Sequence, residues 1–327
     1  MLSSRIVGTG SYVPERILTN ADLEKLVDTS DEWIVTRTGI AERHVASDEQ
    51  ATSDLAYCAA QSALCAAGTD VLDLDMILVA TVTPDMPFPS TACLLQDRLG
   101  ARRAGALDLS AACSGFLYGL AVADGLVRAG SARTVLLVGA ESLTKVVNWK
   151  DRNTCVLFGD GAGAVVLRAH DGEQGILSTH LYADGSRGQL LIIPGGGSRQ
   201  PVSQAVVDSG SAKIQMNGGN EVFKLAVRAM EDAALTALKQ HGFDVKDIDH
   251  LISHQANLRI INALGQRLGV PDHKVIANLQ RVGNTSAASI PIALDEAVRD
   301  GRVKAGDLVL LCAFGGGLTW ASCLIRW

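Results

Sequence analysis

The strongest constraint on the fold is an internal repeat that relates the two halves of the 327-residue chain. The segment Val-Leu-Asp-Leu-Asp-Met-Ile at 71–77 matches Val-Lys-Asp-Ile-Asp-His-Leu at 245–251, an offset of 174 from 71 to 245. A predicted helix ends at a glycine three residues before each segment. Several matches in one order favour a duplicated unit over a chance recurrence of element lengths. We therefore expect residues 1–172 and 173–327 to form two similar halves.

Apolar runs alternate with helix-like stretches, which is typical of an α/β fold. The runs at 75–82, 134–138 and 308–312 have few polar residues, as expected of strands that are covered on both faces. The predicted helices are 54–67, 114–128, 221–240 and 287–299. Because ligands of open α/β sheets bind where the loops after the strands meet, two halves side by side should form one site from the loops of both.

Composition limits the class of protein further. With 47% hydrophobic residues and no low-complexity tract, the chain can bury a large core and is not expected to be disordered. The net charge of −6 disfavours a general nucleic-acid-binding protein. The first residues lack a signal-peptide pattern and no stretch approaches the roughly 18 apolar residues of a membrane span, so we expect a cytoplasmic protein without a membrane partner. Seven cysteines without a CxxC pair favour reduced thiols over disulfides or a zinc site.

One cysteine stands in a setting that suits a nucleophile. Cys113 lies in the segment Asp-Leu-Ser-Ala-Ala-Cys-Ser-Gly-Phe at 108–116, which predicts a strand, a tight turn and then a helix. Small neighbours allow a substrate carbonyl to approach, and the partial positive charge of a helix N-terminus favours the thiolate. The repeat places Cys113 opposite Ser286, at an offset of 173. Taken alone, this motif fits a small buried cysteine at a helix start equally well.

Three polar loops are candidates for the remaining groups of a site. His254 follows a predicted strand, where a lone histidine is more often a structural hydrogen-bonding residue. Asn284 lies in the loop that occupies the repeat position of the cysteine loop, and its amide could cap a turn or donate to developing negative charge. The glycine-rich loop Phe-Gly-Gly-Gly-Leu-Thr-Trp at 314–320 could serve as a turn or present backbone N–H groups to an oxyanion.

Together these motifs resemble β-ketoacyl-acyl carrier protein synthase III, the initiating condensing enzyme of dissociated bacterial fatty acid synthesis in the thiolase-like superfamily. The resemblance rests on Cys113 in DLSAACSGF, His254 in HQANLR, Asn284 in GNTSAAS and the loop FGGGLTW, in this order. It runs from GTGSYVPE near the N-terminus to the final strand. It implies an α/β thiolase-like fold with five layers, α-β-α-β-α, built from two duplicated halves.

The resemblance also implies a reaction. An acyl-CoA starter such as acetyl-CoA would condense with malonyl-acyl carrier protein, with loss of CO₂, to give 3-oxoacyl-acyl carrier protein. Cys113 would carry the acyl group, and His254 and Asn284 would hydrogen-bond the malonyl thioester carbonyl. The backbone N–H groups of Cys113 and Gly316 would form the oxyanion hole. No metal or other cofactor is implied, because the CoA thioester is itself a substrate.

Binding roles follow from the same resemblance. CoA would be bound by a group in which a tryptophan and an arginine enclose the adenine: Thr29, Trp33, Arg37, Arg152 and Asn257. The carrier protein would contact one segment and two further basic residues: Lys224, Gln255, Ala256, Asn257, Leu258, Arg259 and Arg267. Phe88 would lie at the interface of a homodimer and help to close the partner subunit's acyl pocket.

Three alternatives remain open from the sequence. A relative that condenses longer acyl chains, or makes a specialised lipid or signal product, could share the same three residues. A non-catalytic protein could use the fold for ligand binding, although the intact set of Cys, His and Asn argues against it. A thiolase would need a second cysteine near the C-terminus, and Cys312 and Cys323 are candidates by position. Malonyl dependence with CO₂ release would separate a synthase from a thiolase.

Overall fold

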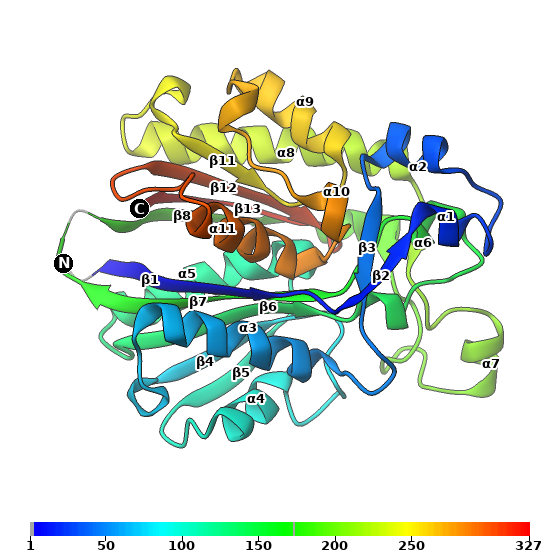
Figure 1. Ribbon diagram of the computed structural model, residues 1–327, viewed down its shortest axis with the longest axis horizontal. Coiled ribbons are helices and arrows are strands. Elements are labelled where there is room, and N and C mark those ends of the chain that lie inside the picture. The colour runs from blue at the N-terminus through cyan, green and yellow to red at the C-terminus, as the bar shows by residue number, and fades with distance from the viewer. Residues whose placement is uncertain (1–2, 173) are drawn as a thin grey trace.

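A computed structural model describes residues 3–172 and 174–327, in which two sheets and three helical layers alternate (Figure 1). The first sheet has the strand order β1-β7-β6-β4-β5 and the second has the order β11-β12-β13-β8. The strands of the first sheet are β1 (Ser3–Tyr12), β4 (Met76–Ala80), β5 (Gly105–Leu109), β6 (Thr134–Glu141) and β7 (Gly161–His170). Those of the second are β8 (Gly175–Ala183), β11 (His250–Ser253), β12 (Leu308–Gly315) and β13 (Thr319–Arg326).

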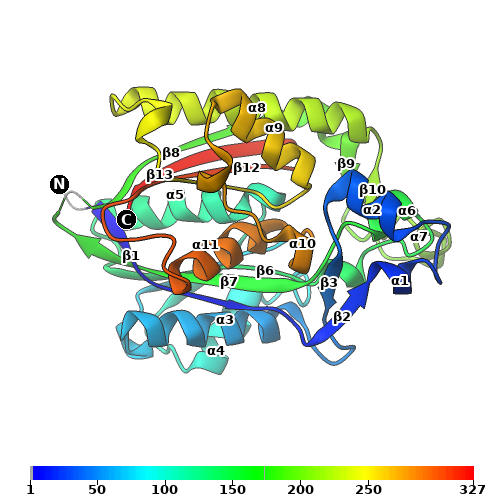
Figure 2. The same ribbon diagram turned by 45° about the horizontal axis from the view of Figure 1, so that its top comes forward.

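Helices cover both outer faces and fill the space between the sheets (Figure 2). The outer helices on the first sheet are α3 (Thr52–Ala67) and α4 (Thr91–Leu99), and those on the second are α8 (Gly219–Gln240) and α9 (Leu258–Leu268). The central layer consists of α5 (Gly115–Arg128) and α11 (Ser289–Arg299). The predicted five-layer α-β-α-β-α fold is therefore confirmed.

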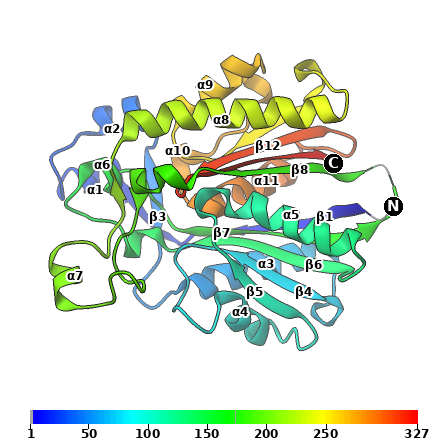
Figure 3. The same ribbon diagram turned by 180° about the vertical axis from the view of Figure 1, so that it is seen from behind.

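Shorter elements gather at one end of the layers, and the C-terminus lies at the other end (Figure 3). The short strands are β2 (Arg16–Thr19), β3 (Glu42–Val45), β9 (Leu191–Ile192) and β10 (Gln215–Met216). The short helices are α1 (Asn20–Leu23), α2 (Asp31–Thr38), α6 (Arg152–Cys155), α7 (Gln204–Asp208) and α10 (Leu279–Val282). Within residues 3–172 and 174–327, no helix combines the length and apolar character that a transmembrane span needs.

The two halves repeat the same elements at one offset. β4 begins at 76 and β11 at 250, α5 at 115 and α11 at 289, and β6 at 134 and β12 at 308, so each pair differs by 174. The predicted boundary between the halves falls at residue 173, which lies outside the described residues. The boundary itself stays a prediction.

The backbone corrects the register of the two loops before the central helices. Short 3₁₀ turns precede α5 and α11: η2 (Ala112–Ser114) and η7 (Ser286–Ala288). Each turn begins with a residue in the left-handed region, Ala112 at φ +47° and Ser286 at φ +48°. Ser286 is therefore the equivalent of Ala112, and Cys113 lies opposite Ala287. The predicted offset of 173 at this point is wrong by one residue, because runs of small residues align equally well in either register.

The buried strands hold the central turns close to the sheet. Every residue of β6 and of β12 is buried, as the apolar runs predicted. Gly139 of β6 faces η7, where a Cβ atom would come within 2.4 Å of the carbonyl oxygen of Ala287. Glycine at this position therefore allows η7 to pack directly on β6, beside the turn that carries Cys113.

Candidate active site

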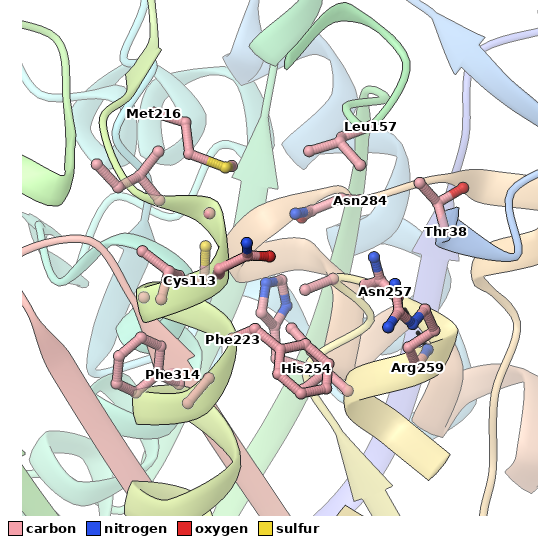
Figure 4. Close-up of a pocket in the computed structure, with 18 of the residues that line it drawn as sticks. Thr38, Cys113, Leu157, Met216, Phe223, His254, Asn257, Arg259, Asn284 and Phe314 are labelled. Carbon is pink, nitrogen blue, oxygen red and sulfur yellow. Dashed lines mark hydrogen bonds between the residues drawn. The ribbon is translucent and has the colours of Figure 1, made fainter. Parts of the chain in front are cut away.

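A cavity of about 760 Å³ lies where loops of both halves meet. The first half contributes Cys113, and the second contributes His254, Asn284 and Phe314. Figure 4 shows the cysteine, the imidazole and the carboxamide facing the same inner space. The structure thus brings together the three residues that the sequence motifs singled out, as expected for loops that follow equivalent strands.

Cys113 lies on η2, directly before the first residue of α5. Its side chain is only 8% exposed. Hydrogen bonds from the backbone N–H groups of Cys113 itself and of Gly316 both lower the pKa of the thiol, so both donors lie beside the sulfur. A Cβ atom on Gly315 would lie 2.6 Å from the Cys113 nitrogen. The close approach of the glycine loop to the cysteine is therefore possible only without a side chain at position 315.

The resting thiol is neutral. Burial is the main cause that raises the pKa of Cys113 to about 11; the charge of Glu141 acts in the same direction, and hydrogen bonding by Ser286 acts against it. The backbone N–H groups of Cys113 and Gly316 lower this pKa, in the direction expected for the helix start, but burial raises it more. The loss of hydration at a nearly closed site outweighs the stabilisation that a helix end supplies.

His254 is a buried, neutral imidazole with a defined tautomer. Burial lowers its pKa to about 3. Its Nδ1 lies 2.7 Å from the hydroxyl of Ser289, and that hydroxyl accepts a hydrogen bond from the backbone N–H of Gln255 at 3.3 Å. We assign the hydroxyl hydrogen to the contact with Nδ1, so that Nδ1 accepts it. The ring proton then sits on Nε2, and the histidine acts as a neutral hydrogen-bond donor.

Asn284 is oriented by its own loop. Its Oδ1 accepts a hydrogen bond from the backbone N–H of Ser286 at 2.9 Å. Its backbone N–H donates to the carbonyl of Leu157 at 2.8 Å, and its carbonyl accepts from Gly159 at 3.0 Å. With the amide oxygen held in this way, the NH₂ group is the part left to meet a ligand in the cavity. His254 and Asn284 therefore present two neutral N–H donors near one thiol.

The predicted CoA-binding residues cluster at the end of the cavity formed by α2. Trp33 and Arg37 line the cavity, and the Arg37 guanidinium lies 4.6 Å from the indole centroid. Arg152 lies 5.1 Å from the same ring and donates to the carbonyl of Asp28 at 2.8 Å. A base between indole and guanidinium needs two stacking contacts, about 7 Å in all. The gap must therefore open by about 2 Å to admit an adenine.

The two further predicted CoA-binding residues differ in their contacts. Asn257 caps α9 by accepting from the Arg259 N–H at 2.8 Å, and it donates to the carbonyl of Arg37 at 2.9 Å. It lines the cavity and ties α9 to α2. Thr29 is half-buried, and among the described residues its hydroxyl has no hydrogen-bond partner.

The predicted carrier-protein segment is only partly on the surface. Gln255 is fully buried, and its amide donates to the carbonyl of Ser253 at 2.7 Å and accepts from the N–H of Asn278 at 3.0 Å. The predicted contact through Gln255 is therefore wrong, because the chain turns this side chain inward after β11. Leu258 packs on the small cluster around Ile40. Ala256 lines the cavity and is half-buried.

Four exposed cations on α8 and α9 form a basic surface, which we define as Lys224, Arg228, Arg259 and Arg267. Lys224, Arg228 and Arg267 line one shallow groove between the two helices, and Arg267 is paired with Glu231 at 2.6 Å. Lys224 and Arg259 also line the main cavity. Sequence reasoning missed Arg228, although its spacing of four residues from Lys224 on a predicted helix places both on one face.

Phe88 lies away from the cavity of its own chain. It is 85% exposed, and Met86 in the same loop between β4 and α4 is 42% exposed. Two large apolar side chains so close together on a surface are typical of an interaction site.

The thiolase alternative finds little support in the structure. Cys312 and Cys323 are fully buried in β12 and β13. Burial raises the pKa of Cys312 to about 12, and it raises that of Cys323 well above its ordinary value. Of the cysteines in the described part of the chain, Cys113 alone lines the cavity. A second thiol is therefore not placed to act as an acid or base there.

Comparisons with known proteins cover the whole chain. The family model described as 3-oxoacyl-acyl carrier protein synthase III matches residues 107–185, and the model of its C-terminal part matches residues 238–327. The chain is similar to the β-ketoacyl-acyl carrier protein synthase III of Xanthomonas euvesicatoria pv. vesicatoria, with 58% identity over 324 residues, 99% of this chain and 98% of that one. A protein of the same name from Caldanaerobacter subterraneus subsp. tengcongensis is 57% identical over 326 residues, with 100% and 98% covered.

Solved structures agree with the sequence matches. The crystal structure of 3-oxoacyl-acyl carrier protein synthase III from Aquifex aeolicus has a TM-score of 0.92 and 49% identity, and the match covers 99% of this chain and 100% of that one. The residue ranges matched by the two family models include Cys113, His254 and Asn284.

Proposed function

This chain belongs to the 3-oxoacyl-acyl carrier protein synthase III family, and from this premise we propose how its cavity performs the initiating condensation of fatty acid synthesis. The enzyme transfers the acyl group of an acyl-CoA starter and condenses it with malonyl-acyl carrier protein. The observation that carries the proposal is the convergence of one thiol and two neutral N–H donors from three loops in one cavity.

In the first half-reaction, the sulfur of Cys113 attacks the thioester carbonyl of acyl-CoA. The carbonyl oxygen becomes an oxyanion, which the N–H groups of Cys113 and Gly316 stabilise. Each such donor is worth roughly 3 kcal/mol in comparable sites. The C–S bond to CoA then breaks, CoA leaves as a free thiol with the proton that Cys113 gave up, and the acyl group stays on Cys113.

In the second half-reaction, malonyl-acyl carrier protein enters and loses CO₂. The electrons of the broken C–C bond form an enolate, so this step needs no base. Nε2–H of His254 and the amide of Asn284 donate to the enolate oxygen. Because burial keeps His254 neutral, it cannot quench the enolate by giving up a proton as an imidazolium would. The enolate carbon attacks acyl-Cys113 and releases 3-oxoacyl-acyl carrier protein.

The substrates and setting follow from this scheme. Acetyl-CoA is the proposed starter, with apolar side chains such as Leu157 and Met216 around the inner cavity. Trp33 and Arg152 hold the adenine. Neither a metal nor another cofactor takes part in these steps, and the proposed compartment is the cytoplasm.

Exposed Phe88 and Met86 support a homodimer in which this loop meets the partner subunit, and sedimentation of the purified chain tests that proposal.

A panel of acyl-CoA starters with malonyl-acyl carrier protein tests the function directly. Straight-chain starters of increasing length and branched starters are compared, and the products are weighed by mass spectrometry. CO₂ release that depends on the malonyl substrate, with acetyl-CoA preferred, is the expected result. A strong preference for long chains would instead support the specialised alternative. Cleavage of 3-oxoacyl-CoA without a malonyl substrate would overturn the synthase assignment.

Replacing Gly315 by alanine should slow the first half-reaction by about a hundredfold. The added Cβ would lie 2.6 Å from the Cys113 nitrogen, so the glycine loop must move and carry the Gly316 N–H away from the oxyanion. Release of free CoA in a single turnover measures this rate. Gly125→Ala is a matched control, because a Cβ on that α5 residue meets nothing within 4 Å. Wild-type acylation by Gly315→Ala would remove the Gly316 donor from the scheme.

Reversing charge on the basic surface should weaken binding of the carrier-protein substrate more than binding of acyl-CoA. Lys224→Glu with Arg259→Glu should raise the KM for malonyl-acyl carrier protein about tenfold, since carrier proteins are acidic and surface charge steers their encounter. The KM for acyl-CoA in the first half-reaction should change less. Lys304→Glu makes the same kind of charge change on an exposed residue just before β12, outside the basic surface. Equal effects of the control and the double variant would contradict a docking role.

A further inference from the structure

A buried cation lies behind the loop that carries Asn284 and has no part in the scheme above. Arg43 on β3 is fully buried. Its guanidinium donates to the carbonyl of Val156 at 2.9 Å, the carbonyl of Leu18 at 3.1 Å and the side-chain oxygen of Asn20 at 2.8 Å. All three acceptors are neutral, and among the described residues its Nε has no hydrogen-bond partner. A charge held in this way is costly to bury, so burial alone does not explain an arginine here.

One of these bonds reaches the segment that holds Asn284 in place. The backbone N–H of Asn284 donates to the carbonyl of Leu157 at 2.8 Å, and its carbonyl accepts from the N–H of Gly159 at 3.0 Å. These two bonds make a short parallel β-bridge, and Leu157 and Asn284 lie side by side at the cavity (Figure 4). Val156, which Arg43 binds, directly precedes this segment. The guanidinium therefore anchors the start of the segment on which Asn284 rests.

The strand that carries Arg43 also contacts the chain on the other side of Asn284. β3 packs against α10, the helix that ends two residues before Asn284. Beside this contact, the N–H of Ala41 donates to the carbonyl of Gln280 at 2.9 Å. The stem of Arg43 lies next to Gly283, where a Cβ atom would come 3.0 Å from the Arg43 Cβ. Arg43 thus contacts both of the chain segments that hold Asn284.

We propose that Arg43 is a positioning residue for the enolate-binding carboxamide of Asn284. Arg43 does not line the cavity, and it acts by fixing the segment that aims the NH₂ group of Asn284 into it. A displacement of about 1 Å at a group that binds the transition state can cost on the order of a hundredfold in rate. A guanidinium suits this role because its rigid fork can bind oxygens of two separate segments at once. This inference rests on the decarboxylation step of the proposed function.

A second arm of the guanidinium leads away from this loop and supplies a matched control. Asn20 accepts from Arg43 through Oδ1, and its amide group donates to Asp31 at 2.8 Å. Asp31 is the first residue of α2, the helix at the adenine end of the cavity. Asn20→Ala should therefore loosen α2 while it leaves the bond from Arg43 to Val156 in place.

The experiment measures the two half-reactions of the full chain separately at saturating substrate, by CO₂ release from malonyl-acyl carrier protein and by CoA release from acyl-CoA. Arg43→Gln should lower the rate of CO₂ release about tenfold or more and that of CoA release less than about twofold. Arg43→Lys, which keeps a donor for Val156 but lacks the fork, should lose less. Unchanged CO₂ release by Arg43→Gln would overturn the proposal, and so would equal losses in the two half-reactions.

Asn20→Ala should raise the KM for acyl-CoA and change the rate of CO₂ release by less than about twofold, because it disturbs α2 and not the segment beneath Asn284. Thermal melting of each variant shows that it is folded. If Asn20→Ala lowered CO₂ release as much as Arg43→Gln does, the loss would reflect a general loosening of the fold, and Arg43 would have no special relation to Asn284.

A double variant tests whether Arg43 acts through Asn284. In an Asn284→Ala background the donor is already gone, so adding Arg43→Gln should lower CO₂ release by less than about twofold more. A further loss as large as in the wild-type background would show that Arg43 acts independently and would refute its role. Arg43→Lys takes the same place in the comparison if Arg43→Gln does not fold. Failure of the wild type to release CO₂ from malonyl-acyl carrier protein would overturn the proposed function instead, which keeps the two failures distinct.

Discussion

Cys113→Ala is expected to lower acyl transfer by at least about a thousandfold and to leave the fold intact. The thiol is the one group in the scheme that forms a covalent bond, and nucleophile removal typically costs that much or more. The exchange removes only a sulfur atom at the cavity wall, so the loss of stability should be small.

The same variant should retain one activity. Loss of CO₂ from the malonyl substrate depends on the donors of His254 and Asn284 and does not pass through the sulfur. Cys113→Ala should therefore still release CO₂ from malonyl-acyl carrier protein while it fails to release CoA from acyl-CoA. Mass spectrometry of the protein after exposure to acyl-CoA checks the first half-reaction. An acyl group found at another residue of the variant would refute the role of Cys113.

His254→Ala and Asn284→Ala are expected to lower the rate of decarboxylation by about a hundredfold to a thousandfold each, the usual loss for one donor to developing charge. Acylation of Cys113 should fall much less, because the oxyanion of that step is bound by backbone N–H groups. The two half-reactions are measured separately, by CO₂ release and by CoA release. A larger effect on acylation than on decarboxylation would contradict these roles.

Conservative variants sharpen this prediction. Asn284→Asp keeps an oxygen for the N–H of Ser286 but replaces the NH₂ donor by an anionic acceptor, so it should impair decarboxylation more than alanine does. Ser289→Ala removes the hydroxyl that fixes the tautomer of His254 and should cause a smaller loss than His254→Ala.

The fold and the three reacting groups could be predicted because local patterns mark them. Continuous apolar runs identified β6 and β12, and a cysteine among small residues at a strand-to-helix turn identified Cys113. The recurrence of elements at one offset predicted that loops far apart in the chain would meet. These signals are periodic and local patterns of residue types, which can be read from the sequence without the tertiary structure.

The predictions that failed concern properties that depend on the tertiary surroundings of a residue. Gln255 lies between two residues that line the cavity, His254 and Ala256, and only the turn after β11 shows that its side chain is buried. The charge state of Cys113 was misjudged because burial, which a sequence does not reveal, outweighs the helix end.

The single offset of 174 also bears on how such a chain came to work. By that offset, His254 of the second copy corresponds to Ala80 of the first, and Cys113 of the first corresponds to Ala287 of the second. At these two positions each half has an alanine where the other half has a reacting side chain. After a gene segment is duplicated, each of the two similar halves can lose a reacting residue that the other half retains. Neither half alone then contains all the reacting side chains, and selection acts on the two halves together.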